Sequence, residues 1–275
     1  MASGVQAGLI HRYTFDGQDA TDTAGDLDGT PAGATFSTDA AQGAYSARFD
    51  GADDYAGFDA SAFNATAFSV AMWVKPAALG NNVQALVSNK TGGAADGFSV
   101  FFNSFGTGDG TLWMETGNGT VGDSAWTDAG LVTAGGWQHV AYTVERAGGQ
   151  ARIYHAGQDE STDTSILDGF DVGGPWRMGL FTDDQFPLDG RLDDVQIYDE
   201  VLGPGAIRFL AENPGAFIPE PATLALLALG GLGLRLRKRS LPAVSSLTTA
   251  SRSPSSTFSQ PPKGSTVSGA LPKGR

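Results

Sequence analysis

Apolar residues alternate with other residues along several short stretches of the chain, most clearly in AFSVAMWVKP and GWQHVAYTVER. Because successive side chains of a strand point to opposite faces, this period of two predicts β-strands with one buried face. QARIYHAG and GFSVFFNS are further short runs rich in β-branched and aromatic residues. The residues predicted to share the buried faces are Phe68, Val70, Met72 and Val74 in the first stretch and Val140, Tyr142 and Val144 in the second.

Glycine-rich turns separate these stretches. GNN, TGGAADG, GTGDG, ETGNGT and RAGGQ combine Gly with Asn, Asp and other turn residues. Many short strands with such turns predict an all-β domain over residues 8–200, as an antiparallel sandwich or barrel. One helix is predicted in GPGAIRFLAENPG, where Ile207, Leu210 and Ala211 share a face and Pro214-Gly215 ends it.

The composition changes after Pro214. Residues 218–275 hold eight of the 17 basic residues and one of the 30 acidic residues, so residues 1–217 carry nine basic and 29 acidic residues. An acidic domain repels nucleic acid and favours cation binding or simple solubility. The chain has no Cys, which excludes a disulfide framework and thiolate metal sites. Residues 241–275 are rich in Ser, Pro, Thr and Gly, and this composition predicts disorder.

Five motifs, in this order, resemble the laminin-G-like (concanavalin-A-like) jelly-roll domains of bacteria: LIHRYTFDG, ARFDGADDYAGF, FSVAMWVKP, GWQHVAYTVERAGGQARIYHAG and LDGRLDDVQIYDEVLGPGAIRFL. The resemblance covers residues 8–212 and implies a two-sheet antiparallel jelly-roll sandwich. Domains of this family commonly bind carbohydrate or protein partners and often hold a structural calcium. The same fold also hosts glycan-cleaving enzymes, so the resemblance leaves the function open.

Residues 219–240 resemble a PEP-CTERM sorting signal. It begins with Pro219, Glu220 and Pro221, and residues 222–234 are then apolar or Gly except for one Thr. As a helix this run would be ~20 Å long against a ~30 Å hydrocarbon core, which suits a temporary anchor. The resemblance implies an exported bacterial protein that an exosortase processes at the inner membrane, tethered transiently and then released or anchored at the cell surface. The basic residues that stay cytoplasmic by the positive-inside rule are Arg235, Arg237, Lys238 and Arg239.

The ends of the chain depart from the usual pattern of such signals. Thirty-five residues follow Ser240, whereas such a signal normally ends the chain. Residues 1–7 (MASGVQA) have neither a basic nor an apolar leader segment, and VQA is typical of the last residues before a signal-peptidase site, so we expect the true start upstream. An amphipathic helix of the domain is the alternative for the apolar run, which is however apolar all round. Residues 213–218 are predicted to be a linker.

Asp193 is the acidic residue for which the pattern predicts a structural role. In GRLDDVQIYDE, the period of two places it on the same face as Val195 and Ile197, which we expect to be buried. Because a buried carboxylate needs a cation or several donors, both an ion pair with Arg191 and a calcium site are open. In the resembling domains a calcium often links the first and last strands. By position, the calcium ligands that the resemblance implies here are Asp16, Asp193, Asp22 and Asp50.

The usual catalytic patterns are absent from the sequence. Glycan hydrolysis needs two carboxylates about 5–9 Å apart, but the Glu-x-Asp-x-x-Glu pattern of the glucanases of this fold does not occur, and neither Glu115 nor Glu145 has an acid two residues on. FDGADDY lacks the Glu that closes an EF-hand loop, and we interpret it as a tight turn with solvated acids. The histidines are far apart in sequence, and we expect His139 to be a sheet residue. We therefore predict a protein without catalytic activity.

Aromatic residues near Gly-rich turns are the candidates for ligand binding, because sugars stack their apolar faces on Trp and Tyr. Trp73 and Trp137 lie in predicted strands, and we interpret them as packing residues. The sequence thus predicts an exported surface module that binds a polysaccharide, with calcium stiffening its scaffold. The alternatives are a protein–protein adhesion or matrix structural protein and a glycan-active hydrolase. The predicted ligand-binding residues are Trp126, Trp176, Trp113 and Asp183.

Overall fold

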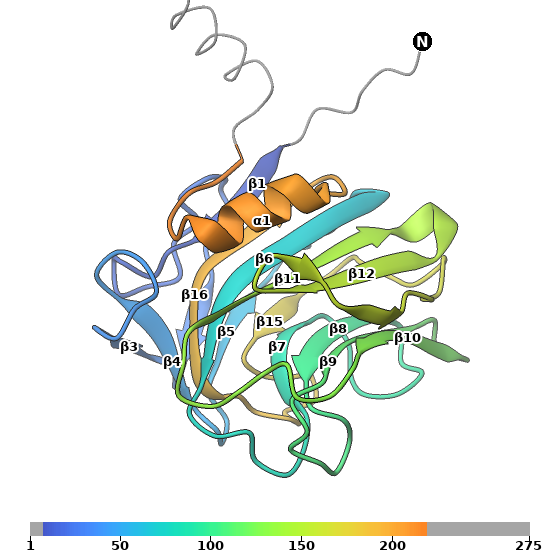
Figure 1. Cartoon of the computed structure of the whole chain (residues 1–275), viewed down its shortest axis with the longest axis horizontal. Helices are drawn as coiled ribbons and strands as arrows, with labels where there is room; N and C mark the ends of the chain where they lie inside the picture. Colours follow the sequence, from blue (N-terminus) through green and yellow to red (C-terminus); the bar gives the residue numbers. More distant parts are fainter. Residues whose placement is uncertain (1–7, 219–275) are drawn as a thin grey trace, which may run out of the picture. The chain divides into compact units, whose positions relative to one another are not determined.

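The structure, a computed structural model, describes residues 8–218. Two eight-stranded antiparallel sheets pack face to face, and one helix lies on the outside (Figure 1). The predicted all-β sandwich is therefore confirmed. The sorting-motif residues from Pro219 to Arg239 and the expected disordered tail, residues 241–275, lie outside the described residues, as do residues 1–7.

The first sheet has the strand order β13-β12-β11-β6-β16-β4-β3, and β1 pairs with the half of β16 that β4 leaves free. Its long central strands are β6 and β11, which have the clearest alternation in the sequence, and β16. The strands are β1 (Leu9–Tyr13), β3 (Thr35–Ser37), β4 (Ser46–Asp50), β6 (Ala67–Pro76), β11 (Gln138–Glu145), β12 (Gln150–His155), β13 (Gln158–Asp159) and β16 (Asp189–Tyr198).

The second sheet has the order β14-β10-β9-β8-β7-β15-β5-β2. Its strands are β2 (Thr30–Ala32), β5 (Tyr55–Phe58), β7 (Gln84–Ser88), β8 (Gly97–Phe102), β9 (Leu112–Gly117), β10 (Gly122–Thr127), β14 (Ser161–Asp163) and β15 (Trp176–Met178). A single turn of 3-10 helix, η1 (Arg146–Gly148), connects β11 to β12 in the first sheet.

The main hydrophobic core lies between the sheets. The alternating residues predicted for β6 and β11 all belong to this core, which confirms the predicted buried faces. The second sheet contributes the other half of the contact, for example Phe98, Val100 and Phe102 from β8 and Leu112 and Met114 from β9. Each strand therefore has an inner face in the core and an outer face that something else must cover or leave to solvent.

Helix α1 (Pro204–Glu212) covers part of the outer face of the first sheet (Figure 1). Pro204 is at the first turn, where its missing N–H costs no hydrogen bond. Ile207 and Leu210 are buried in a second cluster against Tyr154 of β12 and Tyr198 of β16. The helix ends at Glu212, as the following Asn213-Pro214-Gly215 predicts.

A bulge in β16 overturns the predicted orientation of Asp193. The register shifts between Asp193 and Gln196, and Asp194 has a left-handed φ of 46°. Because of the extra residue, Leu192 and Val195 both point into the core. Asp193 is buried as expected, but it lies on the outer face of the first sheet and not beside Val195.

Residues 213–218 do not form a free linker. They turn back after α1 and bond to side chains of β1 and β16. Among residues 8–218, none of the helices has the length and hydrophobicity to cross a bilayer.

Candidate ligand-binding site

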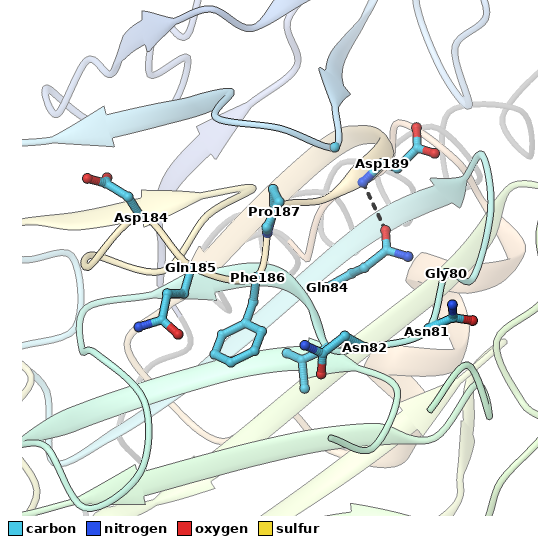
Figure 2. A pocket seen from close by; sticks show the side chains of 11 residues that line it. Gly80, Asn81, Asn82, Gln84, Asp184, Gln185, Phe186, Pro187 and Asp189 are labelled. Atoms are coloured by element: carbon cyan, nitrogen blue, oxygen red, sulfur yellow. Dashed lines mark hydrogen bonds between the residues drawn. The ribbon is translucent and has the colours of Figure 1, made fainter. Parts of the chain in front are cut away.

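A pocket of about 460 Å³ lies at one end of the sandwich, and we call it the rim pocket (Figure 2). Three connections form it: the turn at Gly51 between β4 and β5, the β6–β7 loop and the β15–β16 loop. Phe186 and Pro187 supply an apolar wall. The polar lining residues are Asn81, Asn82, Gln84, Asp184, Gln185 and Asp189.

Buried hydrogen bonds fix the walls of the rim pocket. Gln84 accepts a bond from the Asp189 N–H at 2.8 Å and donates to the carbonyls of Ala78 and Leu79 at 2.9 and 2.7 Å. Gly51 has a φ of +81°, and a Cβ there would lie 2.8 Å from the Cβ of Asp189. Only glycine therefore allows this turn to approach β16 so closely. These contacts make Gln84 a structural residue and preform the pocket.

Other polar groups of the rim pocket are left for a ligand. The side chains of Asn81 and Asp189 make no hydrogen bond within residues 8–218, and Asn82 uses only its oxygen, which accepts the Gly106 N–H at 3.0 Å. Asp184 pairs with Arg177 at 2.6 Å but is 74% exposed. Amides and carboxylates beside the ring of Phe186 can bond hydroxyl groups and pack on an apolar face at the same time.

Six aromatic side chains adjoin the rim pocket on the outer face of the second sheet, and we call them the aromatic face. Trp126 and Trp113 are register partners with ring centroids 5.2 Å apart, and Trp113 stacks on Phe101 at 6.2 Å. Phe105 lies 5.7 Å from Phe101 and 5.5 Å from Phe186, which lines the pocket. The row is therefore continuous with the rim pocket. Its members are Phe101, Phe105, Trp113, Trp126, Phe181 and Phe186.

The predicted ligand-binding residues separate into two groups. Trp113 and Trp126 are brought together, half-buried, in β9 and β10 and not on loops. Asp183 lies in the β15–β16 loop, where it accepts a 2.8 Å bond from Gln185 of the rim pocket. The expectation for Trp176 is wrong. Its side chain is 0% exposed and stacks on Phe58 at 3.8 Å inside the core, so it has no free face for a ligand.

A buried ion pair beside the aromatic face was missed by sequence analysis. Lys90 donates to Glu115 at 3.1 Å, with side chains 0% and 9% exposed. Burial lowers the pKa of Lys90, an effect that the charge of Glu115 opposes. Glu115 Oε2 and the hydroxyl of its register partner Ser99 have no partner within residues 8–218. The only signal was Lys90 itself, a charge between an apolar strand and the loop TGGAAD.

The acids expected to bind calcium accept hydrogen bonds from backbone amides. Asp193 takes the N–H groups of Ala41 and Gln42 at 2.8 and 3.0 Å, and Asp16 takes those of Ala44 and Tyr45 at 2.5 and 3.1 Å. Burial raises the pKa of Asp193 to about 6, although the bonds from Gln42 and Ala41 oppose this. These donors hold residues 41–45 on the sheet. Several donors, and not an ion pair, therefore satisfy Asp193, because Arg191 lies near Asp39 at 3.7 Å.

Asp22 is also saturated. Its carboxylate bonds His11 Nδ1 at 2.5 Å and accepts the N–H groups of four residues. Burial by itself raises its pKa, but these bonds hold it below the ordinary value. A carboxylate surrounded by donors has little left for a cation. The four backbone donors are Arg12, Ala24, Gly25 and Leu27.

Asp50 belongs to a different acidic group. It lies with Asp53 and Asp54 such that one oxygen of each is within 4.8 Å of the others. Burial raises the pKa of Asp54, and the charges of Asp50 and Asp53 add to this. The segment is a tight turn, as expected, with the Ala52 N–H bonded to Asp50 at 2.9 Å. Asp50 pairs with Asp189 across β4 and β16, so the acidic turn adjoins the rim pocket.

Residues 50–208 match the family described as the concanavalin A-like lectin/glucanase superfamily. The chain belongs to this family. Residues 217–240 match the PEP-CTERM protein-sorting motif, which indicates export and sorting to the cell envelope. No curated protein matches the chain.

Solved structures of low sequence identity share the fold of this concanavalin A-like domain. Domain 4 of an extracellular arabinanase from Geobacillus stearothermophilus, solved with arabinotriose, has a TM-score of 0.59 and 20% identity over 75% of this chain and all of its own. The receptor-binding domain of a botulinum neurotoxin C/D mosaic has a TM-score of 0.57 and 14% identity. The binding domain of botulinum neurotoxin DC, solved in complex with rat synaptotagmin II, has a TM-score of 0.56 and 13% identity. Each neurotoxin match covers 74% of this chain, which spans about half (51%) of the neurotoxin domain.

The three histidines of the concanavalin A-like domain lie away from the rim pocket. His139 is within β11, as expected, and burial lowers its pKa to about 4, with a smaller effect from His155. His11 is bonded to Asp22, and His155 contacts Gln138 at 3.2 Å. None of these side chains lines the rim pocket.

Proposed function

We propose that the protein is a non-catalytic cell-envelope module that binds a polysaccharide along the aromatic face and in the rim pocket. The observation that carries the proposal is the continuity of the two, since Phe186 both lines the pocket and contacts Phe105. Phe101 and Phe181 are buried beneath the face, so the rings that offer stacking surfaces are those of Phe105, which is exposed, and of Trp113, Trp126 and Phe186, which are half-buried. The amides and carboxylates of the pocket then orient hydroxyl groups at one end of the ligand.

The charge of the domain favours a neutral polysaccharide over an acidic one. Residues 1–217 carry 29 acidic and nine basic residues. Asp184 and Asp189 line the rim pocket, and Lys90 beside the aromatic face is already paired with Glu115. A field of this sign lowers the local concentration of an anionic chain.

The similar structures support a binding function, with either a saccharide or a protein as the ligand. The arabinanase domain was solved with an oligosaccharide, and the neurotoxin domains bind receptors, in one case rat synaptotagmin II. A protein ligand, as in adhesion or matrix structure, is therefore the second candidate. A glycan-active hydrolase is less favoured, because of the two carboxylates that line the pocket, Asp184 and Asp189, the first is paired with Arg177.

Calcium is part of the proposal as a stiffener of the rim. Asp50, Asp53 and Asp54 supply the oxygen donors that calcium prefers, and the turn that carries them forms one side of the rim pocket. Asp22 and Asp193 are less suited, because both oxygens of each carboxylate already accept hydrogen bonds. Within the described part of the chain, Asp16 keeps one oxygen free but lies apart from this acidic group. We further propose that an exosortase processes residues 219–240, so that the protein is tethered transiently to the inner membrane and then reaches the cell surface.

A glycan array tests the proposed function. The full chain, in detergent, is applied with calcium and again with EDTA, beside Trp113→Ala, Trp126→Ala and the control Trp73→Ala on the outer face of the first sheet. We expect binding to neutral glycans that either substitution in the aromatic face weakens about tenfold and the control leaves unchanged. No binding on an array that a control lectin reads normally would favour a protein ligand. Release of new reducing ends would contradict the non-catalytic assignment.

A further inference from the structure

The residues that enter the sorting motif are held on the folded domain. We call residues 215–218 the strap. Gly215 bonds through both of its backbone groups, with its carbonyl accepting from Arg12 at 2.7 Å and its N–H donating to Asp194 at 3.2 Å. The Ala216 carbonyl accepts from Gln196 at 2.8 Å, and the Ile218 N–H donates to the hydroxyl of Tyr198 at 3.1 Å. Four consecutive residues thus contact one set of side chains, since the guanidinium of Arg12 also lies 5.7 Å from the ring centre of Phe217.

The side chains under the strap form a connected network, and we call them the dock: Arg12, Asp194, Gln196 and Tyr198. Arg12 pairs with Asp194 at 2.7 Å, Asp194 accepts from Gln196 at 3.0 Å, and Tyr198 donates to Gln196 at 2.5 Å. Asp194, Gln196 and Tyr198 are 2%, 3% and 0% exposed. Buried polar groups are costly when a partner is lost, so the dock favours the bound strap.

The bulge of β16 builds this dock. Asp194 adopts a φ of 46°, which is unfavourable for a residue other than glycine. Its carboxylate thereby meets Arg12 from β1 and Gly215 from the strap together. Asp194 thus bonds Arg12, Gln196 and Gly215 from a strained backbone conformation. Strain at a position with three such partners indicates a functional arrangement.

The match to the sorting motif begins at residue 217, so the strap contains the first two residues of the motif. We propose that the dock is a clasp that holds the start of the sorting motif on the folded domain, so that a processing peptidase reaches these residues only when the clasp opens. This inference does not depend on polysaccharide binding, but it rests on the proposed processing of the sorting motif.

The clasp also fixes where the chain leaves the domain. Tyr198 is the last residue of β16, and Asp189 of the rim pocket is its first. At ~3.3 Å per residue the two ends of this strand are about 30 Å apart. In Figure 1 the last described residues lie beside β1 and α1, at this far end of β16. When the clasp is closed, the chain therefore leaves the domain at one end of β16, and the rim pocket lies at the other end.

Hydrogen exchange and limited proteolysis of the full chain in detergent test the clasp. In the wild type we expect the amides of Gly215 and Ile218 to exchange more than about tenfold slower than in an unstructured peptide. Tyr198→Phe removes the acceptor of Ile218, and Arg12→Lys removes the guanidinium that donates to the Gly215 carbonyl and to Asp194 at the same time. We expect each to speed exchange in the strap, and cleavage by chymotrypsin after Phe217, by about two- to tenfold.

Three controls separate opening of the strap from general unfolding. Tyr154→Phe changes another buried tyrosine of the cluster under α1, and within residues 8–218 its hydroxyl makes no hydrogen bond to the strap. The amide of Leu202, which donates to Ser69 at 2.9 Å, and cleavage after Phe105, which is 51% exposed, should not change in any variant. Unprotected exchange at Ile218 in the wild type would overturn the proposal. So would unchanged strap rates in both variants, or equal acceleration after Phe105 and Phe217.

Discussion

The outer faces of the two sheets differ in what covers them. On the first sheet, α1, residues 41–45 and the strap cover tyrosines and buried acids with parts of the same chain. On the second sheet, the aromatic face leaves Phe105 exposed and Trp113 and Trp126 half-buried. Both sheets bury their inner faces in one core.

This difference separates stability from binding. Substitutions on the first outer face remove contacts within the folded chain, so they should act mainly on the free energy of unfolding. Substitutions of the exposed or half-buried residues of the aromatic face, unlike those of the buried Phe101 and Phe181, remove side chains that the fold uses only in part, so they should act mainly on ligand affinity. The buried Lys90–Glu115 pair is the exception, because it lies on the binding side and yet is closed to solvent.

The largest effect is expected from that exception. Lys90→Met leaves the carboxylate of Glu115 buried without its cation, and we expect the free energy of unfolding to fall by about 3–5 kcal/mol in urea titrations. The matched control is Lys75→Met on the first sheet, whose pair with Asp39 is 21% and 39% exposed and should contribute about 1 kcal/mol or less. The double variant Lys90→Met/Glu115→Leu should recover most of the loss. Equal losses for Lys90→Met and Lys75→Met would show that burial does not distinguish the two pairs.

The cover of the first sheet is tested by truncating α1. Ile207→Ala removes a fully buried side chain from the cluster with Tyr154 and Tyr198, and we expect a loss of about 2–4 kcal/mol in the free energy of unfolding. Phe105→Ala on the aromatic face should cost less than about 1 kcal/mol, because 51% of the side chain is exposed. Thermal unfolding followed by circular dichroism measures both. A greater loss from Phe105→Ala would reverse the proposed division between the faces.

Local patterns were sufficient to predict the fold. The alternation in residues 67–76 and 136–146 identified the two central strands of the first sheet with the correct inward faces. The helix after Gly203 followed from its apolar face and its Pro214-Gly215 end. These features depend on near neighbours in sequence, which a pattern can capture.

The site depended on contacts between distant segments, which the pattern did not contain. One extra residue at Asp194 reversed the face of Asp193, and a period of two cannot show a bulge. Trp176 and Trp113 both occupy strands of the second sheet, yet one points into the core and the other outward. The strap was interpreted as a linker because its partners, Arg12 and Asp194, are 203 and 21 residues away from Gly215 in sequence.

The loop that Asp193 holds on the first sheet should give a pH-dependent stability. Burial raises its pKa from 3.8 to about 6, so the folded state keeps this proton as the pH rises through 4 and 5 while the unfolded state loses it. The contribution of this group to stability is therefore full below pH 4 and is lost as the pH rises through 6. At 1.36 kcal/mol per pH unit, the loss is on the order of 2–3 kcal/mol.

Asp193→Asn isolates this contribution from those of the other acids. Relative to the wild type, its free energy of unfolding should increase between pH 4 and pH 6 and then stay level, as measured by urea titration at each pH. Asp53→Asn, at an exposed acid of the rim, is the control. A constant difference between Asp193→Asn and the wild type over this range would show that the buried carboxylate titrates normally.

The smallest expected effect decides whether the rim pocket belongs to the binding surface. Asn81→Ala removes an exposed amide of the pocket that makes no hydrogen bond within residues 8–218, and we expect affinity for the glycan found on the array to fall two- to tenfold without a change in stability. Asn64→Ala, at an exposed asparagine that precedes the opposite end of β6, is the matched control. Isothermal titration measures both. Removing an amide that bonds a ligand hydroxyl must lower the affinity for that ligand. If Asn81→Ala binds the glycan as tightly as Asn64→Ala does, while Trp126→Ala binds it more weakly, the ligand therefore occupies the aromatic face alone.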